Sequence, residues 1–353
     1  RDNRLTEEIP TKIATSSEGT LEEGSNLFYL VIYSEGGRTK TYILDIVPAA
    51  EVPIEYYVGE TLVHCDTALL GQTYTVTFVP TLAGYTFIGW STDGADVIIQ
   101  TKGKKCVRDP YILKGHDENG KECYFIIATD MKALEGWTSN HALITWKSYD
   151  LINWIDETVI DIRQFEGFEN TNRAWAPQAI WDKNENKYMI YWAHSTLEND
   201  VAGMYYAHST DMKTMTEPKP LYIRENIQTI DGDIAYNKEN GMYYLYFKHD
   251  EDQTIAYVKS PNLTGPYEDN SVVVSLAKTG VEGSEIYNIT GTDQWVMIMD
   301  EYGTDRFFMQ QTTDFENFKA VKADDYSMPF NPRHGSVVAI SDEDYEKLIK
   351  AFK

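Results

Sequence analysis

Five stretches of the sequence open with residues that can bind or transform a polar ligand. They begin at Asp109, Trp175-Ala176-Pro177, Asp231, Glu282 and His334, so three of them carry a carboxylate. Each stretch continues as a run of apolar and aromatic residues typical of a β-strand. A single acid at a strand end would most simply cap its own turn. Three acids in corresponding positions, together with an aromatic ring and an imidazole, indicate a shared site.

Carboxylates that converge on one pocket have two sensible uses. They can bind a hard cation such as calcium, which prefers oxygen ligands. They can also cleave a glycosidic bond, which needs one protonated carboxyl group and one ionised carboxylate. Crowding of like charges raises the pKa of one member and would supply the protonated acid. Trp175 favours the sugar, because a flat aromatic ring can stack on the apolar face of a pyranose or furanose.

These stretches recur because the chain repeats one structural unit. In four places an opening strand is followed by a polar loop and a second strand, as in residues 175–193. A third strand then ends in Ser/Thr-x-Asp/Asn and an apolar residue, within residues 147–151, 208–212, 259–263 and 311–315. Asp and Asn side chains cap their own backbone in such turns. Four-stranded units of about 50 to 65 residues predict a β-propeller, whose first strands line a central channel.

We therefore predict an all-β chain, with a five-bladed β-propeller over residues 71–353 and a small Ig-like β-sandwich module over residues 1–70. The fifth unit begins at residues 333–338 and is too short for four strands. Because an incomplete blade leaves strand edges unpaired, we expect strands from about residues 74–100 to complete it. The alternative places residues 50–100 in a separate immunoglobulin-like module.

Five motifs in order, RDPYIL, WAPQAIWD, TIDGDIAY, GVEGSEIYN and PRHGSVVAI, resemble glycoside hydrolase family 43 over roughly residues 105–345. The resemblance implies a five-bladed propeller and an inverting hydrolase of arabinose- or xylose-containing plant saccharides, with some relatives acting on galactose. It implies Asp109 as general base, Glu282 as general acid and Asp231 as the carboxylate that tunes the pKa of the acid. It also implies that His334 lies in the channel, near a calcium ion or water in many relatives.

Two positions depart from the family pattern. Gln178 replaces an acid and Ser284 replaces a proline, and both affect the expected sugar more than the mechanism. Asp233 is an alternative to Asp231, because residues i and i+2 of a regular strand share a side. Arg306 is either a sugar contact or an ordinary surface ion pair. The expected substrate-binding residues are Trp175, Gln178, Arg306 and His334.

The net charge of the chain argues against some classes of binding partner. The formal net charge is −24, which argues against nucleic acid and against an anionic membrane surface. The sequence has no run of 18 apolar residues, so we expect no membrane insertion. Its three cysteines show no zinc-binding spacing. The expected partner is carbohydrate, the expected cofactor is at most calcium, and the expected location is extracellular, cell-surface or periplasmic in a bacterium.

The leading hypothesis is an exo-acting inverting glycosidase of the α-L-arabinofuranosidase or β-xylosidase type. One alternative is a galactose- or galactofuranose-directed glycosidase of the same fold. Others are a non-catalytic carbohydrate-binding propeller and a propeller in which calcium is purely structural.

Overall fold

The computed structural model describes residues 18–20, 26–33, 39–46, 51–58, 61–69, 73–75, 100–302, 306–326 and 334–351. The chain forms two compact units, Arg1–Val97 and Ile98–Ala351. The sequence places the boundary between modules at residue 70, whereas the first unit continues to Val97. Each unit is described separately.

The N-terminal unit contains three antiparallel strand pairs. β2 (Asn26–Tyr33) pairs with β3 (Thr39–Ile46), β4 (Glu51–Val58) with β5 (Thr61–Leu69), and β1 (Glu18–Thr20) with β6 (Thr73–Thr75). The pairing of β6 with β1 explains why this unit extends beyond residue 70. An immunoglobulin-like sandwich is not established by these pairs and stays a prediction.

The second unit consists of four four-stranded antiparallel sheets, as the sequence repeats predict. Blade 1 contains β7 (Val107–His116), β8 (Glu122–Asp130), β9 (Ala142–Ser148) and β10 (Trp154–Asp161). Blade 2 contains β11 (Thr171–Asp182), β12 (Lys187–Thr196), β13 (Gly203–Ser209) and β14 (Lys219–Tyr222). Blade 3 contains β15 (Thr229–Asn237), β16 (Met242–His249), β17 (Thr254–Ser260) and β18 (Val272–Val273). Blade 4 contains β19 (Val281–Asn288), β20 (Trp295–Glu301), β21 (Phe307–Thr312) and β22 (Lys319–Ala320).

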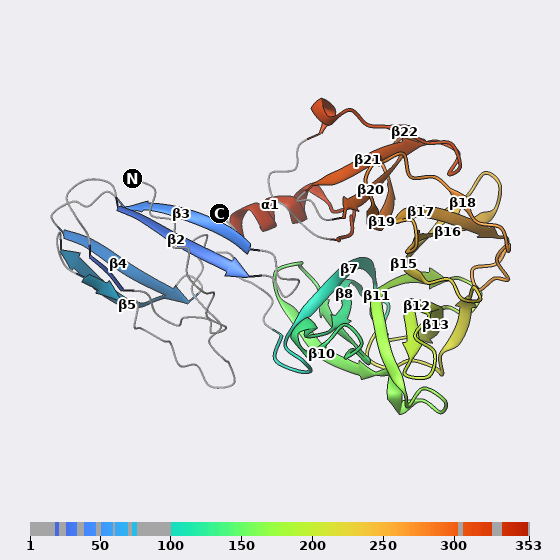
Figure 1. Cartoon of the computed structure of the whole chain (residues 1–353), viewed down its shortest axis with the longest axis horizontal. Coiled ribbons are helices and arrows are strands. Elements are labelled where there is room, and N and C mark those ends of the chain that lie inside the picture. Colours follow the sequence, from blue (N-terminus) through green and yellow to red (C-terminus); the bar gives the residue numbers. More distant parts are fainter. Residues whose placement is uncertain are drawn as a thin grey trace. The chain divides into compact units, whose positions relative to one another are not determined.

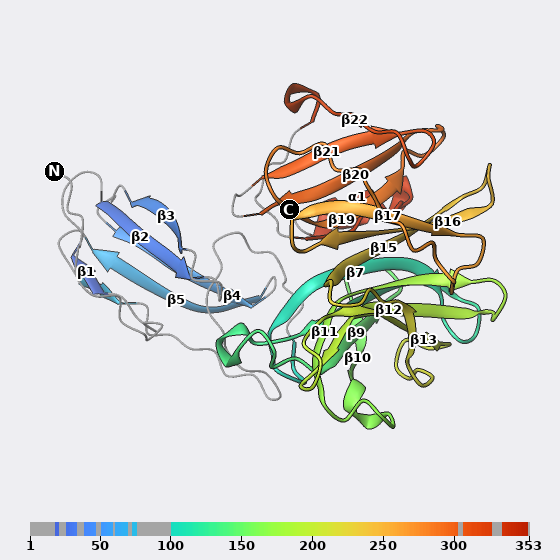
Figure 2. The same ribbon diagram turned by 45° about the vertical axis from the view of Figure 1, so that its right-hand side comes forward.

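The first strand of each blade is the innermost one. β7 contacts β11, β11 contacts β15, and β15 contacts β19, and the blades, coloured from teal to orange, surround one axis (Figures 1 and 2). Large apolar side chains fill the space between neighbouring blades; Tyr191 of blade 2 and Phe247 of blade 3, for example, belong to one buried cluster. This arrangement is an all-β propeller.

The turns that follow the third strands form as predicted. Ser148 Oγ accepts hydrogen bonds from the N–H groups of Asp150 and Leu151, and the Asp150 carboxylate accepts from the next two N–H groups. The same pattern recurs in the turns of residues 209–214 and 312–317.

Helical segments are few among the described residues. Three short 3-10 helices span Ala133–Glu135, Ile162–Gln164 and Ala323–Asp325, and α1 spans Asp342–Ala351. Ser341 caps α1, because its Oγ accepts from Asp344 N at 3.1 Å. Within the described ranges, no helix has both the length and the apolar character needed to cross a membrane.

The predicted fifth blade is not seen in the described part of the chain. Residues 76–99 lie outside that part, and residues 334–340 contain no strand. The latter segment nevertheless joins blade 4 to blade 1: Ser336 Oγ accepts from Ile112 N at 2.7 Å, and Glu285 Oε1 accepts from Val337 N at 3.5 Å. The ring therefore closes through residues 334–337. Completion of a fifth blade by residues 74–100 stays a prediction, although β6 at the start of that stretch pairs with β1 instead.

Candidate active site at the propeller axis

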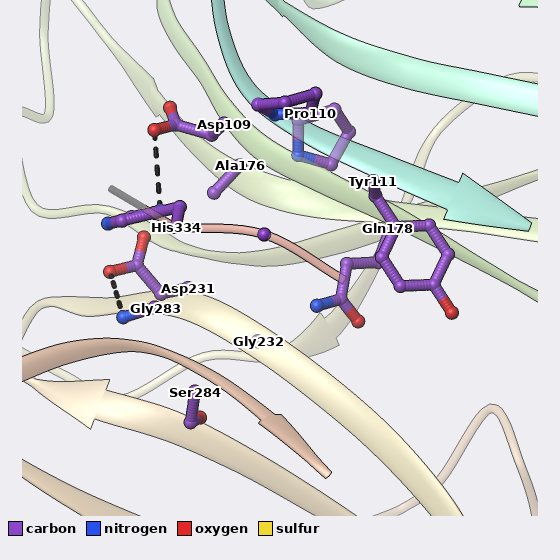
Figure 3. Close-up of a pocket in the computed structure, with 12 residues that line it drawn as sticks. Asp109, Pro110, Tyr111, Ala176, Gln178, Asp231, Gly232, Gly283, Ser284 and His334 are labelled. Carbon is purple, nitrogen blue, oxygen red and sulfur yellow. Dashed lines mark hydrogen bonds and ion pairs between the residues drawn. The ribbon is translucent and has the colours of Figure 1, made fainter. Parts of the chain in front are cut away.

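A β-bulge interrupts the first strand of every blade at the same place. In each first strand, two residues lie opposite a single residue of the second strand. The two residues fall between the paired positions 108 and 111, 175 and 178, 230 and 233, and 282 and 285. The first bulge residue has a positive φ: 46° at Asp109, 44° at Ala176, 52° at Asp231 and 55° at Gly283. His334 repeats this conformation with a φ of 46°. Because a bulge changes the direction of a side chain, these five equivalent positions bring Asp109, Asp231 and His334 together at the axis (Figure 3).

This register corrects the position of Glu282. The sequence aligns Glu282 with Asp109 and Asp231, but Gly283 occupies that place and Glu282 lies one residue earlier. A Cβ on Gly283 would lie 2.7 Å from Cδ2 of His334, so a side chain there would displace the imidazole. The handedness of a bulge is not visible in apolar alternation, and for that reason the one-residue shift could not be read from the sequence.

Twelve residues line the resulting pocket, among them Asp109, Tyr111, Pro177, Gln178, Asp231, Ser284 and His334 (Figure 3). Glu282 lies beside this lining, in contact with His334. The cavity measures about 20 Å³, which is enough for one water molecule.

His334 lies between the carboxylates of Asp109 and Glu282. Its Nδ1 is 3.3 Å from Oδ1 of Asp109, and its Nε2 is 3.8 Å from Oε1 of Glu282. Asp231, Glu282 and His334 each offer one polar atom within 4.8 Å of the other two. Two further contacts orient the acids: Thr129 Oγ1 donates to Asp109 Oδ2 at 3.3 Å, and Gly283 N donates to Asp231 Oδ2 at 3.2 Å.

Lys248 is a member of the site that the sequence reading missed. Its side chain is buried, and Nζ lies 3.0 Å from both Glu282 Oε2 and Asp250 Oδ1. Lys248 pairs across the sheet with Ile230, next to the bulge at Asp231. The available signal was a lysine within the otherwise apolar run YLYFK, because a fully buried lysine almost always has a charged partner.

These charges set different proton affinities on the acids. Burial raises the pKa of Asp231 to about 6, and the neighbouring carboxylates of Glu282 and Asp109 add to this effect. Burial also opposes charge on Glu282, but the charged imidazole of His334 and the ammonium of Lys248 outweigh it and lower the pKa of Glu282 to about 2. The raised pKa therefore belongs to Asp231; burial is its main cause, and crowding of the carboxylates adds to it.

His334 carries the compensating positive charge. Burial alone would lower the pKa of His334, but Asp109, Asp231 and Glu282 together raise it to about 10. Asp231, Glu282 and His334 each also offer an atom that could bind a metal ion, and these atoms lie within 4.8 Å of one another. Calcium takes six to eight oxygen ligands, so the two carboxylates and water would supply most of its contacts here, and a calcium ion near His334 stays a prediction.

The other predicted substrate-binding residues lie in different places. Gln178 lines the pocket and is hydrogen-bonded to two buried residues that do not line it. Its Oε1 accepts from Tyr191 OH at 2.7 Å, and its Nε2 donates to Glu285 at 3.3 Å. Trp175 does not line the pocket; its ring lies 6.3 Å from that of Trp137 in an edge contact, and the guanidinium of Arg173 lies 4.9 Å from its centroid. Arg306 is far more exposed, at 71% of its side chain, and pairs with Glu301 at 3.2 Å. The ion-pair alternative thus describes Arg306, and it is left out of the site.

The ambiguity between Asp231 and Asp233 is also resolved by the bulge. Asp233 does not line the pocket; its Oδ2 accepts from Ile286 N at 2.7 Å, between the first strands of blades 3 and 4. Burial raises the pKa of Asp233 to about 7 and that of Glu285 well above its usual range. These two acids connect the innermost strands and do not face the pocket.

Several known proteins match parts of this chain. A curated α-L-arabinofuranosidase of Bifidobacterium longum is 26% identical over 171 residues, which are 41% of this chain and 15% of that protein. The catalytic domain of a GH62 α-L-arabinofuranosidase of Coprinopsis cinerea matches 66% of this chain and 74% of its own length, with 14% identity and a TM-score of 0.47. An exo-β-1,3-galactanase of Clostridium thermocellum matches 66% of this chain and 50% of its own length, with 12% identity and a TM-score of 0.47.

A family match covers most of the propeller. Residues 86–346 match the family described as "Probable glycosyl hydrolase domain", which is related to glycoside hydrolase family 43. This range includes all four bulges and His334. The chain belongs to this family of glycosyl hydrolase domains.

Proposed function

We propose that the chain is an inverting glycoside hydrolase whose reaction takes place between Asp109 and Glu282. The observation that carries the proposal is the grouping of Asp109, Asp231, Glu282 and His334 around a cavity that fits one water. An inverting mechanism needs a water between the general base and the anomeric carbon. Asp109 lines this cavity, and Glu282 lies on the other side of the His334 ring. A non-catalytic binding propeller would not need this arrangement of acids.

We assign Asp109 as the general base. Its Oδ2 accepts from Thr129 and its Oδ1 faces His334, so both oxygens are held in place at the cavity. In this position a carboxylate can remove a proton from water as the water attacks the sugar.

The acid function is shared by Asp231 and Glu282. Glu282 is the carboxylate implied as proton donor to the leaving oxygen, but His334 and Lys248 favour its ionised form. Asp231, whose pKa is raised to about 6, holds a proton more readily. Because the two carboxylates lie within 4.8 Å, we infer that Asp231 supplies the proton that Glu282 delivers.

The proposed substrates are arabinose- or xylose-containing plant polysaccharides or oligosaccharides, cleaved from a chain end. The curated relative is named an α-L-arabinofuranosidase. A galactose- or galactofuranose-containing substrate is the alternative. Plant polysaccharides occur outside the cell, so we propose an extracellular or periplasmic location for the protein.

The proposal can be tested by measuring the hydrolysis of nitrophenyl glycosides by variants of Asp109 and Glu282. Asp109→Asn should lower kcat by about 10³-fold or more on every substrate, because no other group can activate the water. Glu282→Gln should cost much less on glycosides with good leaving groups, which need little protonation. The product anomer, followed by NMR, should be inverted. Retention of configuration, or near-normal turnover by Asp109→Asn, would defeat the assignment.

A further inference from the structure

A second cavity lies between blades 2 and 3, at the opposite ends of the strands from the acids. Its volume is about 350 Å³, within the range of about 300 to 1,000 Å³ found for ligand pockets. Asp182, which lines it, ends β11, while the bulge at Ala176 begins six residues earlier on the same strand. At about 3.3 Å per residue, the two sites are about 20 Å apart.

The cavity walls are held in place by their own contacts. His208 Nε2 lies 2.9 Å from Asp182 Oδ2, and the backbone of His208 exchanges two hydrogen bonds with Thr216. On the side of blade 3, Tyr267 OH donates to Leu263 O at 2.8 Å. A cavity built in this way exists before any ligand arrives, so that binding needs little ordering of the protein.

The lining selects for a hydroxylated ligand. Only Leu263 among the lining residues is aliphatic, and the polar groups that face the cavity include Asp182, Asn184, Lys187, His208, Lys219 and Asn262. Lys187 and Lys219 form no ion pair within the described residues, and the carboxylate of Asp182 is already paired with His208. Hydrogen-bond donors and acceptors thus stand side by side, with Tyr206 as the aromatic surface.

Other ligand classes fit less well. A lipid tail or drug-like molecule needs a predominantly apolar lining, and nucleic acid needs a basic surface that a chain of net charge −24 does not offer. Sugar hydroxyls donate and accept at once, so they can pair with ammonium, amide and carboxylate groups together.

We propose that this cavity, lined by Asp182, Lys187, Tyr206, His208, Lys219 and Asn262, is a second saccharide-binding site that holds a neutral segment of the polysaccharide cleaved at the axis. This inference rests on the proposed function, because it assumes a polymeric sugar substrate. The second site lies about 20 Å from the acids along the strand. A polymer bound there stays close to the axial pocket, which raises the effective concentration of its cleavable bonds at the acids.

Affinity gel electrophoresis tests the site in the full chain carrying Asp109→Asn, with soluble arabinan, arabinoxylan or β-1,3-galactan in the gel. The double variant Lys187→Ala/Lys219→Ala should bind the retained polymer at least tenfold more weakly, since it removes two charged hydrogen-bond donors from the lining. Asn262→Ala should weaken retention to a smaller extent. Lys183→Ala, an exposed lysine of the same loop that does not line the cavity, is the matched control and should leave retention unchanged.

The outcome can be separated from that of the proposed function. On the wild-type background, the double variant should hydrolyse nitrophenyl glycosides at the normal rate but polysaccharide more slowly at low polymer concentration. If no glycoside is hydrolysed while retention still depends on Lys187 and Lys219, the proposed function fails and the second site stands. Equal retention of the double variant and Lys183→Ala, no retention by any polymer, or retention only by a glucuronic-acid-substituted xylan would overturn the second site.

Discussion

Single side chains at the axis have roles that composition alone does not reveal. Lys248 and His334 are the two cations that offset three acids in a buried place. Both cations lower the pKa of Glu282 and of Asp231, against the effect of burial. The ionisation of the site is therefore a property of five residues together.

Replacing Lys248 should change the pH profile of the proposed reaction. In Lys248→Met the ammonium 3.0 Å from Glu282 is lost. This ammonium lowers the pKa of Glu282 and that of Asp231, the carboxyl group that holds the proton, so both pKa values should rise. An acid that must be protonated loses activity as pH rises through its pKa. The alkaline limb of kcat/KM should therefore move to higher pH, most clearly for substrates with poor leaving groups.

The control for this experiment is Lys259→Met. Lys259 also forms an ion pair with a glutamate, Glu316, at 2.9 Å, but neither residue lines the axial pocket. Its pH profile should match that of the wild type. An unmoved alkaline limb in Lys248→Met would show that Lys248 does not control the proton donor.

His334 should make stability depend on pH. The carboxylates raise its pKa to about 10 in the folded state, above an unfolded value of about 6.5. The stabilisation is therefore fully present below pH about 6.5 and is lost as pH rises from there towards 10. We expect urea denaturation of His334→Gln to show a flatter decline of the free energy of unfolding across this range. His116→Gln, at an exposed histidine, should keep the wild-type decline.

At the level of elements, the bulges decide the chemistry. Four bulges at equivalent positions turn Asp109, Asp231 and the backbone of Gly283 to the axis. The left-handed conformation is costly for residues with a Cβ, yet Asp109 and Asp231 adopt it. Strained backbone of this kind is typical of functional sites.

Adding one methyl group to the bulge of blade 4 should disturb the site selectively. Gly283→Ala places a Cβ 2.7 Å from the His334 ring, at a φ of 55°. Gly291→Ala, at a φ of 82° with no atom within 4 Å of the new Cβ, is the matched control. Both should lose about 1–2 kcal/mol of stability from the left-handed conformation. Only Gly283→Ala should lower kcat/KM, by up to about 100-fold, because it displaces a charged group of the site. Equal activity of the two variants would exclude a positioning role for this glycine.

The elements were largely predictable from the sequence, and the details of the site were not. Alternating aromatic residues and Ser-x-Asp turns predict the strands and turns of all four blades, since both signals are local. The shift of Glu282 against Asp109 depends on a backbone handedness that leaves no mark on alternation. The contact of Lys248 with Glu282 joins different blades, and only the packing of those blades brings the two residues together.

On the scale of the whole propeller, stability depends on closing the ring of blades. Residues 334–337 carry out this closure, because Ser336 bonds to Ile112, 224 residues earlier in the chain. Tyr124 OH, 3.4 Å from Asp344 Oδ2, also ties blade 1 to α1. Contacts between such distant residues make the blades unfold together, because opening one junction leaves unpaired groups at both of its sides.

Removing the closing hydrogen bond should weaken the whole propeller. Ser336→Ala deprives Ile112 N of its acceptor at 2.7 Å, and the unpaired N–H should cost about 1–3 kcal/mol of the free energy of unfolding. Because the bond links the first blade to the end of the ring, the midpoint of the main denaturation transition should fall, and the Ile112 amide should exchange with solvent faster. Ser139→Ala, which removes an exposed bond to Gly136 three residues away, should change stability by less than about 0.5 kcal/mol. If both variants unfold alike, the ring must be held together by its apolar contacts, with the junction at Ser336 contributing nothing measurable.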